Sequence, residues 1–267
     1  MKARAVALLT AIQIAGFACA SGGWCADQPR PESDPVRQDA AIEQEITSGE
    51  AEEKSGKLAQ AEKYYKAAED RYAHLKKGDP RQLDEALWQL AHLYEAEKRF
   101  RLAIDYCNKI IANETVIYGK THILIAECYK YRAQLEQKNG EFAQAKKTYA
   151  VALKLAVPAF EGEYYWCVAA AKDNAWKKDK LVTGCYIGEA ECCEALDDYA
   201  GAEKMYKDGY AACENLNGHL PKEVAEDMIL EGQSAYLKRM KRMDEAKILD
   251  QRRAAMQDFI ARSMRND

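Results

Sequence analysis

The chain has 267 residues, with 39 Lys and Arg against 43 Asp and Glu, so its formal net charge is −4. Hydrophobic residues make up 48% of it, enough to bury an extensive core. The mildly acidic balance and the absence of a basic run argue against nucleic acid as a partner, and beyond the first 20 residues no apolar segment is long enough to span a membrane.

Residues 1–20 have the pattern of a secretory signal peptide. Lys2 and Arg4 precede an apolar run over 5–20, which ends in a small-x-small triplet and is shorter than the roughly 20 residues of a bilayer span. We therefore expect cleavage after Ala20 and an exported protein that is periplasmic, envelope-associated or secreted.

A lipid anchor at Cys19 is the alternative for this terminus. Residues 16–19 resemble a bacterial lipobox, although Gly16 stands where such a box usually has Leu. Residues 21–37 hold three of the six prolines, together with glycine and scattered charge, and are expected to form a flexible linker.

Helical periodicity begins near residue 38 and continues to about 262. Five alanines, each preceded three residues earlier by a large apolar residue and twelve residues earlier by a small one, index the pattern: Ala61, Ala103, Ala145, Ala202 and Ala246. Small residues let two helix axes approach closely, while large ones fill the grooves between them. The pattern therefore predicts five pairs of helices that cross at these alanines.

The spacings between these alanines are 42, 42, 57 and 44 residues, and the long interval marks an insertion of about 15 residues within 158–180. The insertion is rich in aromatics: Phe160, Tyr164, Tyr165, Trp166 and Trp176. Two interpretations stay open. It forms an extra or lengthened helix that packs its rings onto the stack, or it forms a lip that binds a partner.

The last predicted helix, over about 244–262, differs from the earlier second helices. Asp250 and Arg253 stand where apolar residues stood before. Since no further repeat follows, we expect these residues to form the polar outer face of a capping helix.

The block Leu87, Ala91, Tyr94, Phe100, Ala103 and Ile110, with its copy 42 residues later, resembles the tetratricopeptide repeat. The glycine-containing connectors at 118–122 and 217–221 are similar to those of the kinesin-light-chain type, but Lys98 and Asp197 replace the usual turn glycine. Over about 38–260 the resemblance implies an all-α, right-handed α–α superhelix of about five helical pairs. It also implies a concave groove, lined by the first helices, that binds a peptide or a partner protein.

The resemblance implies that one face of each first helix lines the groove. It holds the candidate partner-binding residues Trp88, His92, Glu95, Lys130, Gln134, Ile187, Glu191 and Glu194. An exposed tryptophan beside mixed charge is typical of an interface hot spot, so Trp88 is the leading candidate. The alternatives are that Trp88 packs against the preceding helix and that the charged residues form a solvated face.

The nine cysteines allow a disulfide, which an exported protein could form. Cys107 and Cys128 are the candidate pair, because neighbouring helices should bring them together. The alternative is that the cysteines behave as small buried hydrophobes.

Neither the four histidines nor any other group has the spacing of a metal site, a catalytic dyad or a phosphate-binding loop. We therefore expect no enzyme activity, no metal and no cofactor. The sequence predicts an exported scaffold for protein–protein interaction. One alternative is a structural envelope subunit with weak self-association. The other is a redox-responsive envelope protein that uses Cys185, Cys192 and Cys193.

Overall fold

The computed structural model describes residues 40–74, 79–156, 168–214 and 222–263, without the side chains of residues 168–179, 214, 222, 223, 260 and 263. The described residues form ten α-helices and no strand: α1 (Ala40–Lys54), α2 (Leu58–Ala73), α3 (Pro80–Ala96), α4 (Phe100–Tyr118), α5 (Ile123–Lys138), α6 (Phe142–Ala156), α7 (Val168–Ala195), α8 (Tyr199–Glu214), α9 (Lys222–Arg239) and α10 (Met243–Ser263). The predicted all-α repeat fold is therefore confirmed.

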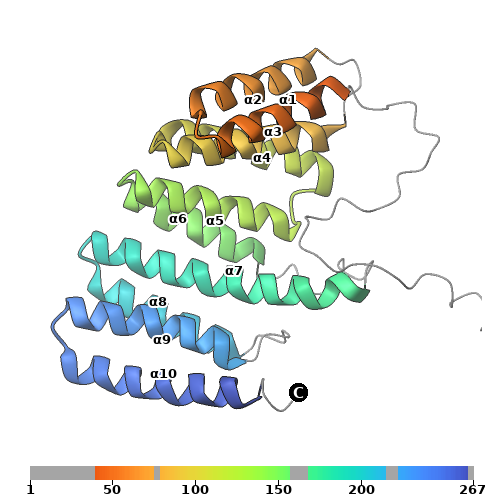
Figure 1. Ribbon diagram of the computed structural model, residues 1–267. Coiled ribbons are helices and arrows are strands. Elements are labelled where there is room, and N and C mark those ends of the chain that lie inside the picture. The colour runs from red at the N-terminus through yellow and green to blue at the C-terminus, as the bar shows by residue number, and fades with distance from the viewer. Residues whose placement is uncertain (1–39, 75–78, 157–167, 215–221, 264–267) are drawn as a thin grey trace, which may run out of the picture. The chain divides into compact units, whose positions relative to one another are not determined.

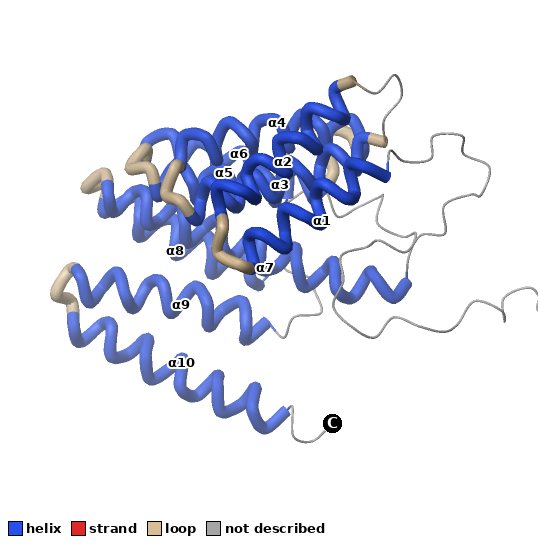
Figure 2. The backbone as a smooth tube through the Cα atoms, turned by 45° about the horizontal axis from the view of Figure 1, so that its top comes forward, coloured by secondary structure: helices blue, strands red, loops and turns tan. Residues whose placement is uncertain are grey.

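Consecutive helices form five hairpins, and each hairpin packs on the next in chain order (Figure 1). The first helices of neighbouring hairpins also touch: α1 contacts α3, α5 contacts α7, and α7 contacts α9. Figure 2 shows the same stack from another side, with short loops joining the two helices of each hairpin. One face of the stack is thus built by the first helices, as the repeat pattern predicts.

The five indexing alanines lie at the centre of the hairpins. Each of them has 0% of its surface exposed, and the small residues twelve positions earlier are buried as well. The core runs through the stack as three clusters, one over α1–α5, one over α5–α8 and one over α7–α10. Because each cluster joins neighbouring hairpins, stability passes along the stack from one repeat to the next.

The turn inside each hairpin adopts one backbone conformation whatever residue occupies it. Five residues before each indexing alanine the φ angle is positive, at Gly56, Lys98, Gly140, Asp197 and Lys241. In the second hairpin Arg99 N donates to Tyr94 O at 2.8 Å, and the other four turns have the corresponding bond. This six-residue closure is the Schellman motif, whose left-handed residue is usually glycine. The turn geometry is therefore retained where Lys98 and Asp197 replace that glycine.

Helix α7 has 28 residues and is the longest of the described helices. Its start at Val168 supports a lengthened helix for the C-terminal part of the 158–180 insertion. Phe160, Tyr164, Tyr165 and Trp166 lie outside the described residues, as does the Trp176 side chain, so the two interpretations of these rings remain predictions. The expected signal peptide (1–20) and linker (21–37) also lie outside them. None of the described helices combines the length and the apolar character that a membrane span requires.

The terminal helix α10 differs from the sequence prediction. Asp250 accepts a hydrogen bond from Ser234 Oγ at 2.6 Å, and Arg253 Nε pairs with Asp227 Oδ1 at 3.0 Å. Both residues therefore face α9 and do not form a polar outer face. They lie four and seven residues after Ala246, which places them on the packing side of the helix. The outer side instead includes Ile248, which is 64% exposed.

Candidate functional site on the inner helical face

We call the face of the stack that the first helices build the inner face. It is lined by structurally equivalent positions of successive first helices. Fifteen residues before the indexing alanines of the last four hairpins stand Trp88, Lys130, Ile187 and Glu231. The same place in the repeat therefore carries an aromatic, a cation, an aliphatic and an anion. Since packing demands are similar at equivalent positions, this variety indicates that the inner face is not built for packing alone.

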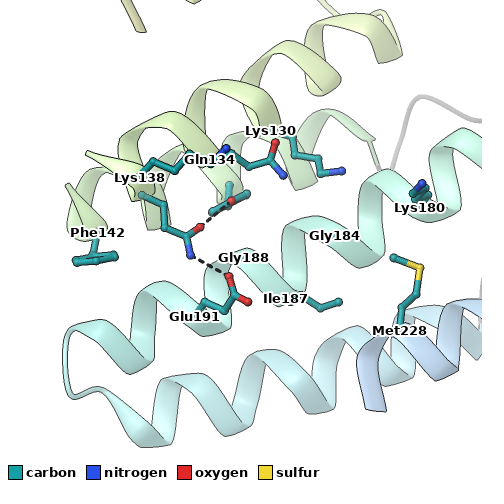
Figure 3. A pocket seen from close by; sticks show the side chains of 12 residues that line it. Lys130, Gln134, Lys138, Phe142, Lys180, Gly184, Ile187, Gly188, Glu191 and Met228 are labelled. Atoms are coloured by element: carbon teal, nitrogen blue, oxygen red, sulfur yellow. Dashed lines mark hydrogen bonds between the residues drawn. The ribbon is translucent and has the colours of Figure 1, made fainter. Parts of the chain in front are cut away.

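A pocket of about 670 Å³ opens on this face between α5, α7 and α9 (Figure 3). It is lined from α5 by Lys130, Gln134, Gln137 and Lys138, from α6 by Phe142 and Tyr149, from α7 by Lys180, Gly184, Ile187, Gly188 and Glu191, and from α9 by Met228. Four of the eight predicted groove residues, Lys130, Gln134, Ile187 and Glu191, are brought together here.

A short hydrogen-bond relay crosses the pocket. Tyr149 donates its hydroxyl to Gln137 Oε1 at 3.0 Å, and Gln137 Nε2 donates to Glu191 Oε2 at 2.8 Å (Figure 3). The relay joins α6, α5 and α7, and it orients the Gln137 amide. Tyr149 was not among the predicted groove residues, because it lies on a second helix.

Two glycines on α7 make room for the pocket wall. A Cβ on Gly188 would lie 2.3 Å from Tyr149 Cζ, and a Cβ on Gly184 would lie 2.9 Å from Lys130 Cε. The end of the Lys130 side chain, its ammonium group included, therefore lies close to the α7 backbone at Gly184, where it lines the pocket. Glycines in a helix interior are costly, so their presence on α7 reflects these close approaches.

The charged side chains of the pocket are mainly cationic. Lys130, Lys138 and Lys180 line it, against one carboxylate, Glu191. Lys138 forms an ion pair with Glu95. Lys130 forms no ion pair with another of the described residues, and it is half-buried beside Ile187 and Met228. The pocket thus combines an available ammonium group with apolar surface.

Trp88, His92 and Tyr131 form a second group of the inner face, between α3 and α5. Their ring centroids lie 5.2–5.5 Å apart. Tyr131 donates to Glu95 at 2.6 Å. Although partial burial acts to raise the pKa of Glu95, hydrogen bonds from Lys138 and Tyr131 outweigh it and hold that pKa below its usual value. Lys138 lines the pocket and pairs with Glu95, so it links the pocket to this second group.

Trp88 is not fully exposed, since it packs against the core cluster that runs over α1–α5. It is half-buried, it stacks on His92, and its Nε1 donates to Glu114 Oε1 of α4 at 3.3 Å. Sequence reasoning missed both Tyr131 and Glu114. A signal for Tyr131 does exist, because the preceding hairpin has the small Cys107 where three of the other hairpins have tyrosine.

Glu194 is separate from both groups. Arg239 of α9 donates to both of its carboxylate oxygens, at 2.7–3.0 Å, and Tyr206 donates to it at 3.1 Å. Its observed contacts tie α7 to α8 and α9.

The expected bridge between Cys107 and Cys128 is not formed, since both are free thiols. The Cys128 thiol faces the carboxyl of Glu114. Burial raises the pKa of Cys107, Cys185 and Cys192 to about 12, so these thiols stay protonated and weakly nucleophilic. Six cysteines are described, and all are buried. Among the described residues no group of His, Cys, Asp and Glu has the arrangement of a metal site.

The stacked hairpins, their shared turn and the pocketed inner face define a helical-repeat scaffold. Residues 82–156, which cover most of α3 and all of α4–α6, match the tetratricopeptide repeat family. The resemblance to tetratricopeptide repeats is therefore confirmed, and these central hairpins are repeats of that type.

Several solved structures share this fold. BtubC (BKLC) from P. vanneervenii is 19% identical, with 85% of this chain and 84% of that chain covered and a TM-score of 0.60. A protein from Podosopora anserina, described as a kinesin light chain with nearly identical TPR-like repeats, is 13% identical, with 83% and 97% covered and a TM-score of 0.59. The apo form of RapI is 13% identical, with 82% and 71% covered and a TM-score of 0.57. At these identities the likeness shows the fold alone. A search of curated proteins found no significant match.

Proposed function

We propose that this protein is an exported scaffold that binds a segment of a partner protein along the inner face of its repeats. Tetratricopeptide folds are typically non-enzymatic scaffolds for protein–protein interaction, which supports the general class. The single observation that carries the proposal is the pocket between α5, α7 and α9. It holds the half-buried Lys130 beside Ile187 and Met228, so it offers one charged and several apolar contacts.

This lining favours a partner segment that combines an apolar side chain with a neighbouring carboxylate. The apolar group would lie against Ile187 and Met228, and the carboxylate would lie near Lys130. Apolar contact supplies most of the affinity in such a complex, while the ion pair contributes to orientation and specificity. The aromatic group around Trp88 would extend the contact along α3.

The test is affinity capture from the native envelope or secreted fraction. The parent is compared with a Lys130→Ala, Ile187→Ala variant, which removes the charged and the apolar contact together. The matched control is Lys147→Ala, Val151→Ala, which makes similar changes at exposed positions of α6 outside the pocket. Circular dichroism confirms that all three proteins keep their helical content.

A partner captured by the parent and the control but lost from the pocket variant would support the proposal. Equal capture of the same partner by all three proteins would contradict it.

Self-assembly is the second candidate function, favoured by the exposed Met243 and Ile248 of α10, which are 58% and 64% exposed. Sedimentation velocity over a range of concentrations tests it, because a scaffold without its partner should stay monomeric.

A further inference from the structure

Two carboxyl groups meet inside the α3–α4 hairpin. Asp84 of α3 and Glu114 of α4 interact directly, and Glu114 is only 5% exposed. Asn113 Nδ2 donates to Asp84 Oδ1 at 3.1 Å, and Trp88 Nε1 donates to Glu114 Oε1 at 3.3 Å. The other oxygen, Glu114 Oε2, is buried with no hydrogen-bond donor among the described residues. A buried carboxylate oxygen without a donor is costly.

Among the described residues, none of the groups that face Glu114 supplies a positive charge to offset two negative ones. The titratable groups that face Glu114 are Asp84 on α3 and Glu127 and Cys128 on α5. Neither Asp84 nor Glu114 forms an ion pair with a lysine or arginine among the described residues. Two buried like charges in contact disfavour ionisation of both, so one of the two carboxyls retains a proton.

The repeat itself does not require these acids. The equivalent pairs of positions in the other hairpins hold Ile42 with Tyr72, Ala126 with Ala156, Thr183 with Cys213, and Asp227 with Gln257. Only the last pair is comparable, and there Gln257 Nε2 donates to Asp227 at 3.2 Å. Arg253 neutralises that aspartate, whereas the buried Ile110 occupies the corresponding position of α4. The second hairpin therefore places two acids in a slot that elsewhere is uncharged or neutralised.

We propose that Asp84 and Glu114 share one proton, and that this proton positions Trp88 and makes the aromatic part of the inner face sensitive to pH. The indole N–H lies against both carboxyls, so a change in their charge acts directly on it. When the shared proton leaves, repulsion from Asp84 and Glu127 pushes Glu114 away, and the hydrogen bond to Trp88 changes with it.

Burial, followed by the charge of Asp84, raises the pKa of Glu114 to about 7, and burial raises the pKa of Asp84 as well. The change at Trp88 therefore falls near neutral pH. Its consequence for partner binding rests on the proposed function. The pH-dependent change at Trp88 does not depend on the proposed function, so it is testable without a partner.

The experiment uses the full chain labelled with ¹⁵N. Its tryptophan indole N–H resonances are followed by NMR from about pH 5 to about pH 9, a range that brackets the titration of a group near neutrality. The Trp88 resonance is assigned by its loss in Trp88→Phe. In the parent it should shift with a midpoint within about one pH unit of 7.

In Glu114→Gln the titration should disappear, because the variant copies the Asp227–Gln257 pair of the last hairpin. The double variant Asp84→Ala, Glu114→Ala copies Ala126 and Ala156, and it serves if the single variant does not fold. Because His92 stacks on Trp88 and its imidazole is ionisable, a His92→Gln variant is the control, in which the titration of Trp88 should persist. A Trp88 resonance that does not titrate, a titration that survives without Glu114, or one that is lost without His92 would each overturn the proposal.

Discussion

The ring of Tyr149 lies directly against the backbone of Gly188 on the next hairpin, where a Cβ would come within 2.3 Å of the ring. The following interface repeats this relationship, since a Cβ on Gly232 would lie 3.1 Å from Tyr206 Cε1. Between α4 and α5 the large and the small residue are exchanged. The first helix α5 supplies the ring of Tyr131, which packs beside the small Cys107 of α4. At this pair of equivalent positions, each of the three interfaces therefore holds one ring, which either of the two hairpins can supply.

This relationship predicts that Gly188→Ala destabilises the fold. The new methyl group would collide with Tyr149, whose ring is 2% exposed and has little room to move. Overpacking of this kind costs roughly 1–3 kcal/mol. Urea unfolding followed by circular dichroism measures the change in the free energy of unfolding.

Gly184→Ala is the matched control on the same helix. There the new methyl group meets only the end of the flexible Lys130 side chain. The intrinsic preference of helices for alanine over glycine, about 0.5–1 kcal/mol, should leave this variant neutral or stabilised. Equal destabilisation of the two variants would refute the packing explanation.

Lys98→Gly should stabilise the protein. Lys98 is exposed and has a φ of 59°, a left-handed conformation that costs a residue with a Cβ roughly 1 kcal/mol more than it costs glycine. The reverse change, Gly140→Ala at the equivalent turn with φ 80°, should destabilise by a similar amount. Thermal unfolding of both variants checks the prediction, and opposite signs are required.

The stability of the parent should fall as pH rises through about 7. Glu114 has a folded pKa raised from 4.5 to about 7, so the folded state binds more protons than the unfolded state between these values. The contribution of protonated Glu114 to stability is fully present below pH 4.5 and is lost as the pH rises through the folded pKa. Glu114→Gln should therefore gain roughly 1–3 kcal/mol relative to the parent between about pH 5 and about pH 8. Urea unfolding at several pH values measures this difference, and a constant difference would contradict it.

The described cysteines should resist modification in the native protein. Cys185 and Cys192 are fully buried, and burial raises the pKa of each thiol to about 12, which keeps the reactive thiolate scarce. Labelling with a thiol reagent before and after denaturation, with sites mapped by mass spectrometry, provides the measurement. Rapid native labelling of Cys192 or Cys193 would restore the redox alternative.

The N-terminus of the protein from its native source should be Ser21, since we propose cleavage after Ala20. Intact mass and N-terminal peptide analysis of the exported protein test this directly. A lipid-modified Cys19 at the N-terminus would establish the anchored alternative instead, and an unprocessed Met1 would contradict export by this route.

The sequence by itself determined the helical pairs and the residues at which they cross. Ala61 and Ala145 could be recognised because burial at a helix crossing demands a small residue at a regular period, and that demand is visible in the local pattern. The length of the repeat was visible for the same reason. So was the replacement of the usual turn glycine by Lys98 and Asp197. The backbone conformation of those turns is imposed by the hairpin, whatever the residue.

Only the tertiary structure decided which side chains meet across the repeats. Trp88 and Glu114 are 26 residues apart in the chain, and Gln137 and Glu191 are 54 apart. Asp250 and Arg253 look like surface residues in a polar helix, yet they bond to Ser234 and Asp227 of α9. Such contacts depend on the rotation and separation of helices, which arise from packing summed over the whole stack. The pocket at Lys130 likewise exists because two glycines of α7 let side chains of the neighbouring hairpin approach the helix closely. The distance between two hairpins cannot be read from a local sequence pattern.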